Sequence, residues 1–136
     1  MDNSGILLEE TLKIALETVP KLPGRVFPVA DIQHSEGPIA VYEQKEESED
    51  NAMDGLTGLV TAVFLIHVIH STYERMRLLS EQVKSAVQTM RQSTHSTLHI
   101  EEVTVNLASP DIYELRVEQF RRSYQVTFQY QIKEDK

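Results

Sequence analysis

The sequence predicts an α+β fold in which two helices pack on one face of an antiparallel β-sheet. Three observations lead to this prediction. Apolar residues recur at three- and four-residue steps within residues 6–19 and 72–92, which is the period of a helix. Residues 60–70 are apolar on both faces of an extended chain, as in a central strand. The last third alternates apolar and polar residues, which is typical of an antiparallel sheet with one packed face.

The first helix is expected over Ile6–Val19. Asn3 or Ser4 can cap its amino end, and Pro20 ends it. Its apolar stripe is formed by Leu8, Leu12, Ala15, Leu16 and Val19.

Two short strands are expected next, at Arg25–Pro28 and Ile39–Gln44. The segment that follows, Lys45–Leu56, has almost no apolar content, so burial cannot offset the entropy lost on ordering it. The sequence therefore predicts a mobile acidic loop at about residues 45–57. Its acidic residues include Glu46, Glu47, Glu49, Asp50 and Asp54.

The strongest strand signal covers Val60–His70. One face of this strand is apolar throughout: Val60, Ala62, Phe64, Ile66 and Val68. The other face is mostly apolar as well: Thr61, Val63, Leu65, His67 and Ile69. Such a strand lies either in the centre of a sandwich or beneath another chain. In a chain of this size, coverage of one face of the strand by another chain is a serious alternative to a central position in a sandwich.

The second helix is expected to begin at Ser71–Glu74, which has the form of a capping box, and to reach about Gln92. Strands are expected at Leu98–Leu107, at Tyr113–Val117 and at Tyr124–Ile132. The stretch between the last two strands is either a bulge or a turn.

Composition limits the function classes. The chain has 136 residues, 40% hydrophobic and 25% charged, which fits a single soluble domain spanning residues 1–136. Its formal charge of −8 disfavours binding of nucleic acid through phosphate neutralisation. It has no cysteine, which excludes disulfides and thiolate chemistry. The amino-terminal residues do not form a signal peptide, and the longest apolar run is too short to cross a bilayer.

Motifs for catalysis or metal binding do not emerge. His67 and His70 lie three apart in a strand, so they point to opposite faces and cannot hold one metal ion. The acidic segment lacks the ligand spacing of a calcium loop, and a nucleophile elbow is missing. Arg121 and Arg122 are interpreted as a charged pair that protects an edge strand. We therefore expect no enzyme activity, no metal and no cofactor.

Three short motifs occur in a characteristic order: Gly24–Pro28 (GRVFP), Gly37–Glu43 (GPIAVYE) and His70–Glu74 (HSTYE). With their spacing, and with the closing β section matching by pattern, they cover most of residues 1–132. This order resembles that of the tail-completion proteins (tail terminators, head-to-tail joining proteins) of long-tailed bacteriophages and prophages.

The resemblance implies a structural virion protein, made in the cytoplasm of a bacterial host, with an α+β fold and no catalytic residues. Such proteins form a ring, commonly of six subunits, at the head-proximal end of the tail. The ring stops growth of the tail tube and docks on the head connector. The implied partners are copies of the chain itself, the tail-tube protein and the head connector proteins, with neither sequence-specific nucleic-acid binding nor a membrane.

A closed ring needs two different patches on each subunit. We hypothesise that the contact between subunits involves Val63, Leu65 and Ile69. The acidic loop, with Glu46, Glu47, Glu49, Asp50 and Asp54, could face the lumen, where carboxylates repel passing DNA. It could also become ordered on docking, or be a solvated loop without a role.

Other function classes stay open at this point. A head–tail connector component (a stopper or adaptor) has the same small α+β plan as a tail terminator. A non-viral protein–protein interaction module would also use an apolar face. A small enzyme would need an acid–base pair, such as Glu and His on the sheet, that no motif reveals.

Overall fold

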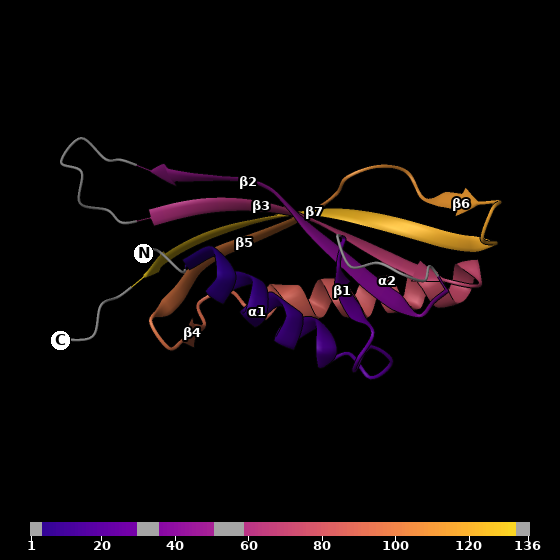
Figure 1. Cartoon of the computed structure of the whole chain (residues 1–136), viewed down its shortest axis with the longest axis horizontal. Coiled ribbons are helices and arrows are strands. Elements are labelled where there is room, and N and C mark those ends of the chain that lie inside the picture. Colours follow the sequence, from indigo (N-terminus) through magenta and orange to yellow (C-terminus); the bar gives the residue numbers. More distant parts are fainter. Residues whose placement is uncertain (1–3, 30–35, 51–58, 133–136) are drawn as a thin grey trace.

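A computed structural model of the chain describes residues 4–29, 36–50 and 59–132. Two helices and seven strands make up this part of the chain (Figure 1). The elements are α1 (Ser4–Glu17), β1 (Val26–Pro28), β2 (Ile39–Asp50), β3 (Leu59–His70), α2 (Tyr73–Gln88), β4 (Thr94–His95), β5 (Leu98–Leu107), β6 (Ile112–Glu114) and β7 (Gln119–Ile132).

The strands form one twisted sheet in the order β1-β2-β3-β7-β5-β4. Strand β6 pairs with the beginning of β7, on the edge of β7 that β5 occupies further along the strand. The predicted α+β class and the placement of both helices on one face are confirmed (Figure 1). The prediction of a purely antiparallel sheet is wrong, because β1 runs parallel to β2. A parallel pair needs a longer connection than a hairpin, and the residues between Pro28 and Ile39 supply that length.

The core lies between the sheet and the two helices. Side chains of β3 alternate strictly, so that Phe64 and Ile66 are fully buried against the helices. Phe64 meets Phe128 of β7 edge to face, with ring centroids 5.7 Å apart. The helices contribute the apolar stripes expected from their sequence: Leu8, Leu12 and Leu16 from α1, and Leu79, Val83 and Val87 from α2.

Strand β2 is longer than predicted and includes half of the segment expected to be a loop. It continues through Lys45–Asp50, paired with β3 as far as Leu59, with a β-bulge between Gln44 and Glu46. The prediction considered side-chain burial alone, whereas the strand gains its pairing from the backbone of β3. Residues 51–57 of the expected loop lie outside the described part of the chain.

The ends of other elements also differ from expectation. Helix α2 is capped by Thr72, whose Oγ1 accepts a hydrogen bond from the Arg75 backbone N–H at 3.2 Å, so Ser71 is not the cap. The helix ends at Gln88 because the chain turns there toward the short β4. Strand β7 begins at Gln119, so the stretch that was expected to be a bulge or a turn before Tyr124 belongs to the strand itself. No helix in the described residues is long and apolar enough to span a bilayer.

Candidate functional site

Both helices cover one face of the sheet, and we call the opposite face the open face. Its centre is formed by Val63 and Leu65 of β3, which are half-buried and alternate with the core residues of the same strand. Polar side chains lie beside them on the neighbouring strands: Glu43 and Glu46 on β2, and Gln125 and Thr127 on β7. The open face therefore carries a narrow apolar centre between an acidic strand and a strand of amides and hydroxyls.

Ile69, the third residue of the hypothesised subunit contact, lies in a different environment. It packs with Ile39 and Val41 in a second small apolar cluster, to which Phe27 of β1 adds a partly buried ring. Only 8% of Ile69 is exposed, so little of it can be covered by a partner. The accessible part of the hypothesised contact is thus Val63 and Leu65.

A serine, a histidine and a glutamate from three adjacent strands line up on the open face. His67 Nδ1 forms a 2.7 Å hydrogen bond with Ser123 Oγ, and His67 Nε2 lies 3.5 Å from Glu43 Oε1. Burial lowers the pKa of His67, an effect that the hydrogen bond to Glu43 only partly opposes. The histidine is therefore held neutral, with Ser123 on one nitrogen and the carboxylate on the other.

The order serine–histidine–carboxylate is that of hydrolytic triads, but the surroundings differ from those of a nucleophile. Ser123 is 5% exposed and lies within β7, between β3 and the strands on its other side. A nucleophilic serine needs an oxygen that a substrate carbonyl can reach, beside free donors for the oxyanion. The arrangement instead ties β2, β3 and β7 together across the open face.

The acidic residues singled out in the sequence are spread along β2. Glu46 and Glu47 are exposed, and Glu47 Oε1 accepts a 2.6 Å hydrogen bond from the Tyr130 hydroxyl. Glu49 and Asp50 pair through their backbones with Val60 and Leu59. Asp54 lies outside the described residues.

The three sequence motifs come together at one end of the sheet. Arg25 of the first motif donates hydrogen bonds to the carbonyl oxygens of Pro38 at 2.6 Å and of Glu36 at 2.8 Å. Gly37 of the second motif passes against the backbone of Ile69 and His70, where the third motif begins. The Gly37 N–H donates to Gln119 Oε1 at 2.9 Å, which adds the start of β7 to the same junction.

Arg122 is a structural residue that the sequence interpretation missed. It is 9% exposed, and its Nε and Nη2 donate to the two carboxylate oxygens of Asp111, each at 2.8 Å. This bidentate contact raises the pKa of Arg122 and lowers the pKa of Asp111. The sequence pattern does indicate that Arg122 is buried, because it follows the same alternation along β7 as Tyr124 and Val126 and so lies on the same, buried face.

The segment Ile112–Glu118, which comprises β6 and the turn into β7, forms an arm at the end of the sheet (Figure 1). The Arg122–Asp111 contact fixes its base, and Arg121 Nη1 lies 3.1 Å from Glu114 Oε1. Tyr113 packs on Phe120 with ring centroids 4.7 Å apart, and Phe120 in turn meets Tyr73 of α2. The turn of this fixed arm exposes Leu115, of which 80% is accessible to solvent.

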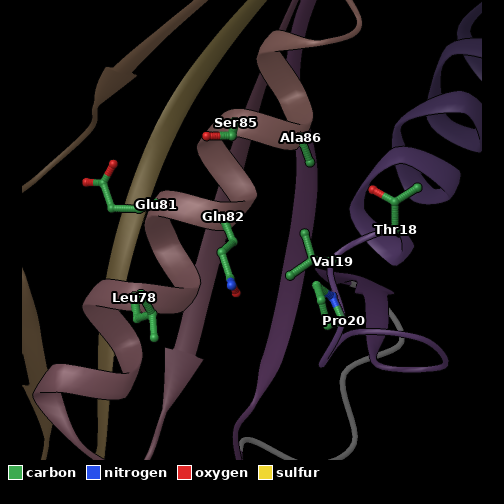
Figure 2. Close-up of a pocket in the computed structure, with 8 residues that line it drawn as sticks. All are labelled: Thr18, Val19, Pro20, Leu78, Glu81, Gln82, Ser85 and Ala86. Carbon is green, nitrogen blue, oxygen red and sulfur yellow. The ribbon is translucent and has the colours of Figure 1, made fainter.

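A groove of about 350 Å³ lies between the end of α1 and the outer side of α2. We call it the helix groove, and Figure 2 shows α2 on one side with the residues after α1 on the other. It is lined by Thr18, Val19, Pro20, Leu78, Glu81, Gln82, Ser85 and Ala86. A neighbouring hollow of about 400 Å³ shares Leu78 and Glu81 and extends to Tyr73 and Glu74. Leu78, common to both, is 65% exposed.

Histidines and carboxylates do not gather into a metal site among the described residues. His67 lies on the open face and His70 on the helix face, as their spacing in β3 predicted. His99 Nδ1 is hydrogen-bonded to Thr94 Oγ1 at 2.7 Å, and His95 Nε2 to Ser93 Oγ at 2.9 Å.

Comparison with known proteins finds a similar fold but no similar sequence. No family model and no curated protein matches the chain. Among solved structures, the chain is similar to one in the virion of a native gene transfer agent particle, with a TM-score of 0.66 and 12% sequence identity. The likeness covers 96% of this chain and 98% of that one, so the two share a fold over nearly their whole lengths.

Proposed function

We propose that this protein is a structural component of a phage-like virion, and specifically a tail-completion protein that forms a ring at the head-proximal end of the tail. The observation that carries the proposal is the end-to-end likeness to a chain of a gene transfer agent virion. The more specific role rests on the motif order Gly24–Pro28, Gly37–Glu43 and His70–Glu74, which resembles that of tail-completion proteins.

The proposed role is assembly rather than catalysis. The Ser123–His67–Glu43 array serves as a bridge between strands, and the open face provides a surface for contact between copies. Val63 and Leu65 offer an apolar centre, and the surrounding carboxylates, amides and hydroxyls can form polar contacts at its rim. A head–tail connector component would use the same fold, so the experiment must separate the two positions in the particle.

Electron microscopy of particles made with and without the protein tests the proposal. Loss of a tail terminator should give overlong tails that fail to join, and adding back the purified protein should restore normal length and joining. Loss of a connector component should instead leave tails of normal length that fail to join. Normal joined particles in the absence of the protein would overturn the proposed role in assembly.

A substitution on the open face tests the surface. Leu65→Asp places a carboxylate at the apolar centre, between the already acidic β2 and the amide of Gln125. We expect this variant to lose self-association, measured by sedimentation velocity, and to fail in the add-back experiment. Lys13→Asp, at an exposed position on α1, is the matched control and should behave as the unmodified protein. Unchanged assembly of Leu65→Asp would show that the open face is not a subunit contact.

A further inference from the structure

The arm and the helix groove each leave apolar surface uncovered in the single chain. Leu115 at the tip of the arm is 80% exposed and Tyr113 beside it 44%, while Leu78 in the groove is 65% exposed. Groups of large apolar side chains that stay exposed on a fixed surface commonly mark contacts with other proteins. Neither surface belongs to the open face described above.

The arm is held in a defined position rather than left free. The bidentate Arg122–Asp111 contact, the Arg121–Glu114 ion pair and the Tyr113–Phe120 ring contact all restrain it. Tyr73 of α2 adds a fourth restraint through its ring contact with Phe120, on which Tyr113 packs. A surface fixed before binding loses little conformational entropy when a partner covers it. The arm is therefore suited to inserting its tip into a recess.

The helix groove matches the arm in polarity and in charge. Val19, Leu78 and Ala86 contribute apolar atoms to its lining; Ala86 lies toward Val19, and Leu78 lies further along α2 (Figure 2). Its rim carries Glu81, whose ion-pair contact with Arg122 is long at 3.9 Å. The adjoining hollow carries Glu74 and also Arg77, whose guanidinium is engaged with the ring and hydroxyl of Tyr73. On the arm, Arg116 follows Leu115 directly and makes no ion pair with the described residues. The arm also carries Glu118 and Glu114, the latter paired with Arg121, so the correspondence is between Leu115 and the apolar lining and between the free Arg116 guanidinium and the carboxylates of Glu81 and Glu74.

We propose that the arm of one copy of this chain docks in the helix groove of the next copy, with Leu115 against Leu78 and Arg116 beside Glu81 and Glu74. The two halves of this contact are different surfaces, so it repeats head to tail, as a closed ring requires. The inference rests on the proposed ring but concerns a contact that the open face does not provide.

Directed disulfide formation tests the contact, since the chain contains no cysteine of its own. Leu115→Cys and Leu78→Cys are made as separate proteins that carry tags of different mass, and they are then mixed and oxidised. Both positions are exposed, so the fold should tolerate the changes. A mixed disulfide dimer should form, and it should grow in yield with protein concentration.

The matched control replaces Leu78→Cys with Ile14→Cys, at a site on α1 that is 66% exposed and does not line the groove. We expect at least a tenfold lower yield of mixed dimer with this control. Equal yields for Leu78→Cys and Ile14→Cys would overturn the inference, as would capture of Leu115→Cys by another tail protein in place of Leu78→Cys.

A charge reversal gives a second readout that does not depend on cysteine. Arg116→Glu should weaken self-association, and Glu81→Arg in the partner should restore it. If the disulfide and charge-reversal tests both fail while normal rings still form on tails, the contact between arm and helix groove is wrong and the proposed function is not contradicted. If the Leu115→Cys and Leu78→Cys proteins cross-link efficiently but tails assemble normally without the protein, the contact is supported and the proposed function is wrong.

Discussion

Gly37 lies where two backbones approach each other closely. A Cβ at this position would meet the Ile69 carbonyl oxygen and the His70 Cα, which are backbone atoms that cannot rotate away. The same residue donates its N–H to Gln119, so the segment cannot shift without losing that bond. The glycine of the GPIAVYE motif is thus required by the packing of the chain against the end of β3.

Gly37→Ala should lower the free energy of unfolding by at least about 3 kcal/mol, the upper range for overpacking in a fixed site. Gly24→Ala provides the comparison, because Gly24 has a φ of +73° but open space around its Cβ position. Its cost should be limited to the left-handed backbone, about 1–2 kcal/mol. Urea denaturation measures both, and equal costs would contradict the assigned clash.

His67 and His70 make stability depend on pH. Burial lowers the pKa of each below the ordinary value of 6.5, and the nearby charges of Arg75 and Lys21 add to the effect at His70. Protonation of His70 would also remove the acceptor that its Nδ1 provides for the Ser71 N–H at 2.8 Å. Both side chains are therefore neutral in the folded protein at pH 7.

The unfolded chain binds more protons than the folded one once the pH falls below about 6.5, so acid favours unfolding. We expect the free energy of unfolding to be constant above that pH and to decrease as the pH falls from it toward the lowered pKa values. His67→Gln and His70→Gln should each flatten this decrease, and the double variant should flatten it most. A slope that the double variant retains would assign the pH dependence to other groups.

At the scale of elements, the start of α2 shows what a local motif can and cannot specify. The sequence Ser71–Glu74 correctly predicts that a helix begins here, since hydroxyl residues precede an amphipathic stretch. Its interpretation as a capping box assigns the cap to Ser71, which is wrong. Thr72 takes that role because its backbone is extended, at φ −125° and ψ 154°, while Ser71 directly follows β3.

Thr72→Ala should therefore destabilise the protein by about 1 kcal/mol, the usual cost of losing an N-cap. Ser71→Ala should change stability by less than about 0.5 kcal/mol, as is typical of an exposed position. Thermal or urea unfolding followed by circular dichroism distinguishes the two. A larger loss for Ser71→Ala would restore the capping box as first predicted.

Several elements were predictable because their own side chains specify them. The alternation of β3 and β7 and the stripes of α1 and α2 each record which face is buried. The acidic half of β2 was not predictable in this way, since its pairing comes from the backbone of β3. The sequence does not distinguish Arg121 from Arg122, yet their environments differ. Arg121 pairs with Glu114 on the arm, whereas Arg122 is buried and pairs with Asp111 at the base of the arm.

At the scale of the whole molecule, we have proposed three surfaces for association: the arm, the helix groove and the open face. Any partner that binds only the folded state raises the apparent stability by mass action. If copies associate as proposed, the melting temperature should rise with protein concentration. Differential scanning calorimetry over a dilution series measures this, and Leu65→Asp should reduce the dependence. A melting temperature independent of concentration would contradict self-association of the free protein.

The bulge between Gln44 and Glu46 has an effect beyond its own position. Because one extra residue is inserted there, Glu46 stands opposite Val63, and Glu47 comes to the side where it reaches the Tyr130 hydroxyl. Removing Lys45 would restore simple alternation with the pairing unchanged, so Glu46 would stay opposite Val63 and Glu47 opposite Ala62. The inserted residue thus sets the side of each later carboxylate of β2: in a strand that kept Lys45 without the bulge, Lys45 would stand opposite Val63, and Glu46 and Glu47 would exchange sides.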